Sequence, residues 1–175
     1  ASPEKISLDG DSRKIKSGIF KSPVSGSIEL GYLGFHGDRV GDTKIHGGKD
    51  KAAWAYCVDH FSYWNNKLQR QLIPGAFGEN ISLSGMSELE INIGDIFETG
   101  TAQVQVTQPR QPCHKLNKVF GEQDIACDIK KNGYSGYYFR VLTPGFVKSG
   151  MPIKVLKKDP AGFSIEKANA LLRKG

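Results

Sequence analysis

One thiol, Cys113, stands in a stiff corner between two predicted elements. The preceding segment 102–107 alternates between polar and apolar residues, which is typical of a half-buried β-strand. Pro109 and Pro112 fix φ and lack backbone N–H groups, so they predict a rigid loop rather than a longer strand. Helical sequence follows at 115–120. A cysteine held in this way is suited to act as a soft metal ligand or as a nucleophile.

The residues around Cys113 leave both kinds of chemistry open. Arg110, three positions earlier, provides a cation that favours the thiolate. His114 is the next residue, but adjacent side chains often point apart, so this position does not place it beside the thiol. Together with His36 and His46, the set lacks the close paired spacing of a zinc site. A cysteine–histidine nucleophile with His46 or His36 as its base is compatible with the sequence.

A long glycine-rich loop, 31–48, leads into the clearest helical periodicity of the chain. The apolar residues of this predicted helix recur at steps of three and four: Trp54, Cys57, Phe61, Trp64 and Leu68. Asp50 is the expected N-cap. Gly47, Gly48 and Lys49 would then precede a helix N-terminus, where free backbone N–H groups and the helix dipole attract anions. The loop is therefore expected to be functional.

Many short strands separated by turn signals, with few helices, predict a mainly β protein with some α structure, a β-barrel with peripheral helices. The expected strands cover residues 14–20, 27–30, 81–83, 91–97, 102–107, 137–142 and 153–156. We expect a polar lead-in at 1–13, the barrel domain at 14–160, and the incomplete start of a C-terminal helical segment at 161–175. That segment should begin a helix at Ser164 but has nothing in the sequence to pack against. Another short helix is expected at 122–131.

Composition bounds the class of protein. A chain of 175 residues with 38% hydrophobic and 24% charged residues is long enough to bury a core. Its net charge of +6 is spread along the chain without a basic run, which argues against specific nucleic-acid binding. No apolar run has the length of a membrane span. Three cysteines without paired spacing predict a reducing compartment, the cytoplasm, and Cys57 and Cys127 are expected to be structural.

Six short motifs occur in order between about Lys14 and Leu156. They are Gly37-Asp38, His46-Gly47-Gly48, Tyr63-Trp64, Phe77-Gly78-Glu79-Asn80, Gly94-Asp95 and Gln108-Pro109-Arg110-Gln111-Pro112-Cys113. Each is weak alone, but the six in register resemble the MOSC domain, named for the C-terminal domain of molybdenum cofactor sulfurases. Within that family, the chain is most similar to small stand-alone bacterial proteins. Those proteins are linked to resistance against N-hydroxylated base analogues such as 6-hydroxylaminopurine.

The resemblance implies a MOSC-type β-barrel that binds the molybdenum cofactor, molybdopterin. Cys113 occupies the family position of the cysteine that ligates the metal or receives sulfur for it, so it is both the expected metal ligand and a catalytic residue. A thiolate agrees with that role because it is a soft ligand. Arg110 is expected to neutralise the anionic cofactor. Gly47, Gly48 and Lys49 are expected to hold its phosphate.

Three further residues complete the expected site. Asn80 and His46 would hydrogen-bond the pterin or the substrate, and Asp38 would orient one of them, so His46 and Asp38 are counted with the catalytic residues. Glu79 is open to a structural role instead.

The resemblance also implies an activity and its partners. Better understood members reduce N-hydroxylated substrates, and without a flavin, haem or iron–sulfur motif this chain would need electrons from a separate flavin reductase. The small stand-alone members of the family dimerise through a C-terminal three-helix region. In this chain only residues 164–172 match the beginning of that region, and a homodimer is the oligomer that the resemblance implies. Two alternatives stay open: a non-catalytic carrier of cofactor, or of sulfur on Cys113, and a metal-free cysteine–histidine hydrolase.

Overall fold

The computed structural model describes residues 4–8, 11–17, 21, 23–38, 47–113 and 115–174. Its strands are β1 (Glu4–Leu8), β2 (Asp11–Ser17), β3 (Ser27–Gly31), β4 (Gly34–Phe35), β5 (Ala53–Cys57), β6 (Ile81–Leu83), β7 (Ile96–Thr99), β8 (Ala102–Pro109), β9 (Tyr137–Thr143), β10 (Gly145–Lys148) and β11 (Ile153–Lys157). Its α-helices are α2 (Phe61–Leu68), α3 (Lys115–Phe120), α4 (Ile125–Asn132) and α5 (Ile165–Leu172). Two short 3-10 turns, η1 (Lys49–Lys51) and η2 (Val58–His60), flank β5.

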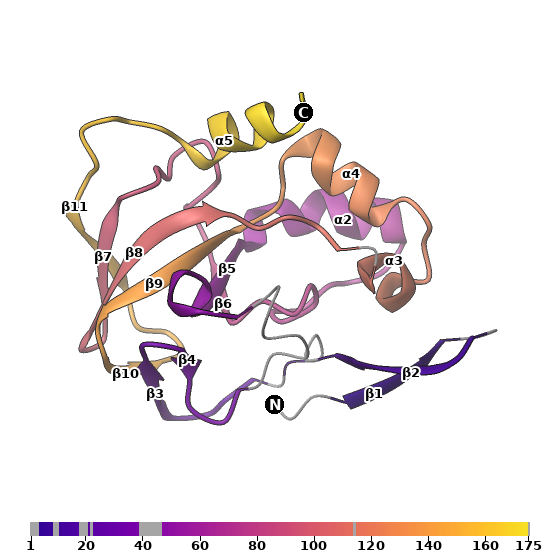
Figure 1. Cartoon of the computed structure of the whole chain (residues 1–175), viewed down its shortest axis with the longest axis horizontal. Coiled ribbons are helices and arrows are strands. Elements are labelled where there is room, and N and C mark those ends of the chain that lie inside the picture. The colour runs from indigo at the N-terminus through magenta and orange to yellow at the C-terminus, as the bar shows by residue number, and fades with distance from the viewer. Residues whose placement is uncertain are drawn as a thin grey trace.

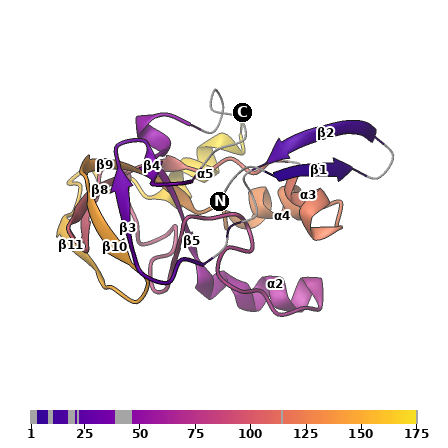
Figure 2. The same ribbon diagram turned by 90° about the horizontal axis from the view of Figure 1, so that it is seen from below.

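The strands form two larger sheets and one hairpin. A six-stranded sheet has the order β11-β7-β8-β9-β5-β6, and a three-stranded sheet has the order β10-β3-β4. All pairs in the large sheet are antiparallel except β5 with β6, so it is a mixed sheet. The two sheets form a half-open barrel, and β1 and β2 are drawn apart from it as a separate hairpin (Figures 1 and 2). The expected mainly β class with a barrel and a few helices is confirmed.

The large sheet separates two apolar cores because its central strands alternate between them. On β5, Ala53 and Ala55 face the barrel interior, whereas Trp54 and Tyr56 join an aromatic cluster under the helices. Tyr138 of β9 is in the same aromatic cluster. The helices α2, α3 and α4 lie together beside the sheets (Figure 1). Residues of β5 and β9 therefore connect the barrel to the helical side.

The predicted long helix is wrong in its first half. Residues 53–57 are the strand β5, every residue of which is buried, and only 61–68 form α2. An uninterrupted apolar run cannot distinguish a strand covered on both faces from a buried helix, and here the alternation of small and aromatic side chains is the relevant pattern. Two other expectations also need correction. The segment 91–97 becomes strand only at Ile96, and β10 lies in a segment for which no strand was expected.

The C-terminal helix is part of the fold. As expected, it begins at Ser164, whose hydroxyl accepts a hydrogen bond from the Lys167 N–H at 3.2 Å. The expectation that it has nothing to pack against is wrong, because Ile165 is fully buried in the barrel core. The backbone also ties the helix down, since the Ile165 N–H donates to the Ile91 carbonyl at 2.9 Å. Within the described part of the chain, no helix combines the length and apolar character that a membrane span requires.

Candidate functional site

Arg110 is a buried cation at the end of β8. Only 7% of its surface is exposed, and its guanidinium carbon lies 4.0 Å from the centre of the Trp54 ring. Its backbone N–H donates to the Gly136 carbonyl at 3.1 Å, which fixes the point where the chain leaves the strand. Burial lowers the pKa of Arg110, and the nearby Tyr138 and Cys113 partly offset that effect. Sequence reasoning named Arg110 but missed its two aromatic neighbours.

No carboxylate of the described residues forms an ion pair with Arg110. A buried charge ordinarily requires an opposite charge, because removal from water costs several kcal/mol of free energy. Aromatic faces supply part of that compensation, about 1–2 kcal/mol. An anionic ligand would compensate the rest of the free-energy cost of burying this charge, so Arg110 has the character of an anion-binding residue.

Cys113 lies three positions after this cation, in the corner between β8 and α3. It is partly exposed, and its carbonyl accepts a hydrogen bond from the Leu116 N–H at 2.9 Å as α3 begins. Its sulfur contributes to the electrostatic surroundings of Arg110 and Tyr138, where it raises the pKa of both groups. The predicted strand-to-helix corner is therefore confirmed, although Pro109 is the last residue of β8 rather than lying beyond it.

The other two cysteines are poor candidates for chemistry. Cys57 is buried on β5, and burial raises the pKa of its thiol to about 11, so it stays protonated at neutral pH. The expectation that it is a core residue is confirmed, although on a strand. Cys127 is exposed on α4. Cys113 combines access to solvent with a buried cation nearby in sequence, Arg110.

A second polar group is centred on Asp38. Its carboxylate pairs with the Lys21 ammonium at 2.5 Å and accepts a hydrogen bond from the Asn80 amide at 2.7 Å. Burial opposes ionisation of Asp38, but these partners outweigh it and lower its pKa. The Asn80 amide oxygen in turn accepts the Trp54 backbone N–H at 3.0 Å. Asp38 and Asn80 are thus joined to the residue that stacks on Arg110.

A cavity of about 570 Å³ borders this second group. Lys21, Asp38 and Asn80 line it together with apolar side chains from both larger sheets: Ile28, Phe35, Ile81, Leu83, Val147 and Ile153. Exposed His36 also lines it. Its volume lies within the usual range of small-molecule sites.

Gly47, Gly48 and Lys49 do not precede an α-helix as expected. They lead into the three-residue turn η1 and then into β5, so the helix-dipole argument for phosphate binding fails at this point. Gly48 has a φ of 103°, which explains the glycine in terms of backbone conformation. The turn nevertheless reaches the site, because the Lys51 ammonium lies 5.9 Å from the centre of the Tyr138 ring.

The remaining predicted residues have two different outcomes. Glu79 is buried and accepts backbone N–H groups of Gly75 and Phe77 at 2.7 and 3.1 Å, which favours the structural role. His46 and His114 lie outside the described residues. Among the residues that are described, no cluster of three or more histidine, cysteine or acidic side chains forms a metal site.

Sequence reasoning missed Lys21, Trp54 and Tyr138. The signal for Lys21 was absent, because only folding brings it to Asp38. Trp54 and Tyr138 were recognisable as apolar strand or helix residues, but nothing in their spacing indicated that both would lie beside one arginine.

Comparison with known proteins identifies relatives. The family model described as the MOSC domain matches residues 42–154, more than half of the chain. YflK of Bacillus subtilis is 41% identical over 94% of this chain and 74% of its own length, and YiiM of Escherichia coli is 39% identical over 81% and 65%. A Gibberella moniliformis protein named Reductase is 30% identical over 91% of this chain but only 29% of its own length.

Solved structures agree with these sequences. The crystal structure of YiiM from Geobacillus stearothermophilus superposes with a TM-score of 0.81 at 35% identity, covering 98% of this chain and 80% of that one. YiiM from Escherichia coli superposes with a TM-score of 0.76 at 33% identity, covering 87% and 72%. The half-open barrel and its peripheral helices are therefore an arrangement shared with solved proteins.

Proposed function

Because this chain belongs to the MOSC domain family, we propose that it binds the molybdenum cofactor and reduces N-hydroxylated compounds. When bound, the cofactor would supply the two-electron redox chemistry that cleaves the N–O bond. The chain's own residues would bind and orient the cofactor and the substrate. N-hydroxylated bases and other hydroxylamines are the proposed substrates.

The single observation that carries this proposal is the burial of Arg110, a cation three positions before Cys113 in the corner between β8 and α3. Arg110 is buried against aromatic rings without a carboxylate partner among the described residues, so it suits an anionic ligand. Cys113 lies in its neighbourhood with a partly exposed thiol, a soft donor suited to a thiophilic metal. The donor set therefore fits a group that has both a negative charge and molybdenum.

Other residues are proposed to act around this pair. Asp38 and Asn80, held together by their hydrogen bond, would contact the pterin or the substrate. Backbone and side-chain groups of 47–49 would approach the phosphate from a loop rather than from a helix N-terminus. His46 keeps its proposed role as a hydrogen-bonding and catalytic residue.

Electrons would come from a separate flavin reductase. In the Gibberella protein named Reductase, a segment similar to this chain makes up 29% of a much longer protein. In that protein a MOSC-like segment and further residues share one chain. The flavin reductase is proposed as a separate partner of this chain, and dimerisation is a further proposal.

Molybdenum content tests the proposal directly. Wild type and Cys113→Ala would be purified from cells able to make the cofactor, and molybdenum per chain would be measured by elemental analysis. We expect near-stoichiometric metal in wild type and loss in Cys113→Ala, with Cys127→Ala as the control because that thiol is exposed on α4. Reduction of a hydroxylamine with an added flavin reductase would then be assayed.

The alternatives give different results in the same experiment. A carrier would contain molybdenum without reducing the hydroxylamine. A thiol hydrolase would contain no molybdenum and would still lose its activity in Cys113→Ala. Absence of metal from wild type would contradict the proposed function.

A further inference from the structure

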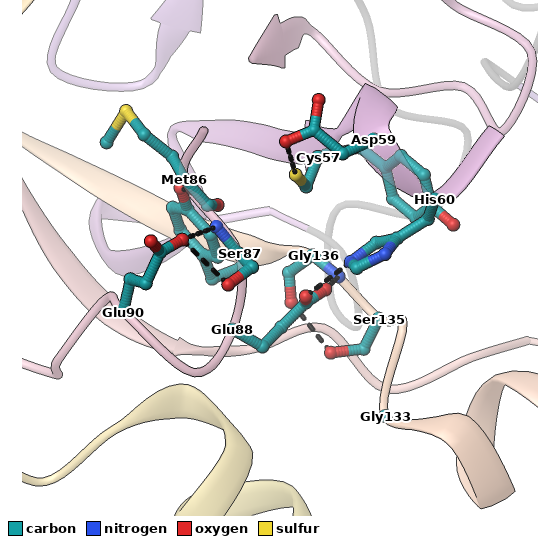
Figure 3. A network of polar contacts seen from close by, with 12 residues as sticks. Cys57, Asp59, His60, Met86, Ser87, Glu88, Glu90, Gly133, Ser135 and Gly136 are labelled. Atoms are coloured by element: carbon teal, nitrogen blue, oxygen red, sulfur yellow. Dashed lines mark hydrogen bonds and ion pairs between the residues drawn. The ribbon is translucent and has the colours of Figure 1, made fainter. Parts of the chain in front are cut away.

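Glu88 lies in the segment between β6 and β7. Its side chain is buried, and each of its two carboxylate oxygens has a hydrogen-bond partner. Only 4% of its surface is exposed. One carboxylate oxygen accepts the Gly136 backbone N–H at 2.7 Å, and the other lies 2.7 Å from Nε2 of His60 (Figure 3). None of the roles proposed above uses this residue, although a buried carboxylate needs an explanation.

The segment that Glu88 holds is the one that supports the Arg110 site. The Gly136 carbonyl accepts the Arg110 backbone N–H at 3.1 Å. The preceding carbonyl, that of Ser135, accepts the Trp54 indole N–H at 3.2 Å. Glu88 therefore fixes a peptide segment whose two carbonyls contact both members of the Arg110–Trp54 stack.

The conformation of Gly136 leaves little freedom in this segment. Its φ of +65° is in the left-handed region, where glycine is favoured. A Cβ at this position would lie 2.2 Å from the Ala55 carbonyl oxygen and 2.5 Å from the Trp54 indole nitrogen. The backbone at Gly136 thus lies close to β5. The hydrogen bond from the Gly136 N–H to Glu88 would help to set the distance between this backbone and β5.

His60 limits where the Glu88 side chain can lie. Its ring stacks on Tyr134, with centroids 3.8 Å apart and planes inclined by 10°. The side chains of His60 and Glu88 are 11% and 5% exposed, so water contributes little to this pair. Tyr134 also directly precedes the segment that Glu88 holds, so one compact unit surrounds the carboxylate.

We propose that Glu88 is a positioning residue for the anion site. Through its hydrogen bond to the Gly136 N–H it would set the positions of Arg110 and Trp54. The length of its side chain, rather than its negative charge, would be the property that matters. This inference rests on the proposed function only for the identity of the anion, the molybdenum cofactor.

Two conservative variants separate reach from charge. Glu88→Gln keeps the length: its amide oxygen can accept the Gly136 N–H, and its NH2 can donate to Nε2 of His60 in the tautomer that carries no proton on that nitrogen. Glu88→Asp keeps the charge but is one methylene shorter, so it cannot reach both partners. If Glu88 acted by its charge, the aspartate variant would behave like wild type and the glutamine variant would not.

Two measurements would be made on the full chain. The first is the position of the Arg110 amide and Trp54 indole signals in ¹H–¹⁵N NMR spectra, and the second is molybdenum per chain. We expect Glu88→Gln to keep both near wild type. We expect Glu88→Asp to move both signals and to lower molybdenum content roughly tenfold, the usual effect of losing a residue that orients a metal site. Asp95→Asn, a change at another buried carboxylate, is the matched control and should move neither signal.

The outcomes are distinct from those that test the proposed function. Loss of either property in Glu88→Gln, or wild-type behaviour of Glu88→Asp, overturns the positioning role. Absence of molybdenum from wild type contradicts the proposed function alone, because the two NMR signals still report whether Glu88 positions Arg110 and Trp54.

Discussion

Two buried charges at the ends of neighbouring strands are satisfied in different ways. Asp95, which is fully buried, precedes β7, and it accepts hydrogen bonds from the Lys158 ammonium at 2.8 Å and from the Asn92 and Asp159 backbone N–H groups at 2.9 and 2.8 Å. Arg110 follows β8 and has aromatic faces but no carboxylate among the described residues. One charge is fully compensated within the fold, and the other is not.

The difference separates a structural charge from a binding charge. Asp95 joins β7 to the segment that follows β11, so its hydrogen bonds stabilise the folded chain itself. Arg110 provides the protein with a desolvated cation whose best partner would come from outside. If this distinction is right, mutations at the two residues should have opposite effects on stability and on cofactor content.

The largest effect on stability is expected for Asp95→Ala. It would leave two backbone N–H groups without their acceptor, which should lower the free energy of unfolding by about 1–3 kcal/mol for each group, whereas the half-exposed Lys158 ammonium can turn to water. Urea denaturation would measure this loss, with the exposed Glu90→Ala as control. Molybdenum content of the folded fraction should stay at the wild-type level. A parallel loss of metal would contradict the distinction.

The reverse pattern, a loss of molybdenum without a loss of stability, is expected for Arg110→Met. Methionine removes a desolvated charge and keeps much of the side-chain volume, so the free energy of unfolding should not fall. Molybdenum content should fall to background, because the proposed anion site has lost its cation. Arg140→Met is the matched control, since Arg140 pairs with Asp50 at 3.0 Å. A large loss of stability in Arg110→Met would show that the arginine is a structural charge instead.

The sequence was sufficient for the fold class and for the local features that short patterns determine. The alternation in 102–107 predicted β8, and Ser164 predicted the start of α5. Side chains that alternate or cap a helix depend on neighbours within a few residues, so periodicity reveals them. By contrast, β5 was taken for a helix, because its burial on both faces depends on strands and helices far away in the chain.

The candidate site was predictable as a set of motifs but not as a geometry. Cys113 and Arg110 were named because they lie close together in sequence. Lys21, Trp54 and Glu88 were not, since their contacts with the site cross long sequence separations, as in the hydrogen bond from Gly136 to Glu88. Such pairings follow from sheet order and turn conformation, which local patterns do not specify.

Acid should weaken the fold through Asp95 but not through Arg110. Burial opposes ionisation of Asp95, yet the Lys158 ammonium and the backbone N–H groups outweigh it and lower its pKa. A depressed folded-state pKa contributes stability that is present above the unfolded value, about 3.9, and is lost as the pH falls through that value toward the folded one. The effect should be smaller than that of Asp95→Ala, because a protonated carboxyl still fills its site and keeps part of its hydrogen bonding.

The test is the free energy of unfolding between about pH 5 and pH 2, measured with urea for wild type, Asp95→Asn and Arg110→Met. The decline should be shallower in Asp95→Asn than in wild type, because its amide does not titrate. Arg110→Met should run parallel to wild type, because a guanidinium stays protonated throughout this range. Equal slopes in wild type and Asp95→Asn would mean that Lys158 and the backbone donors do not hold the carboxylate as described. That result would contradict the interpretation of Asp95 as a structural charge.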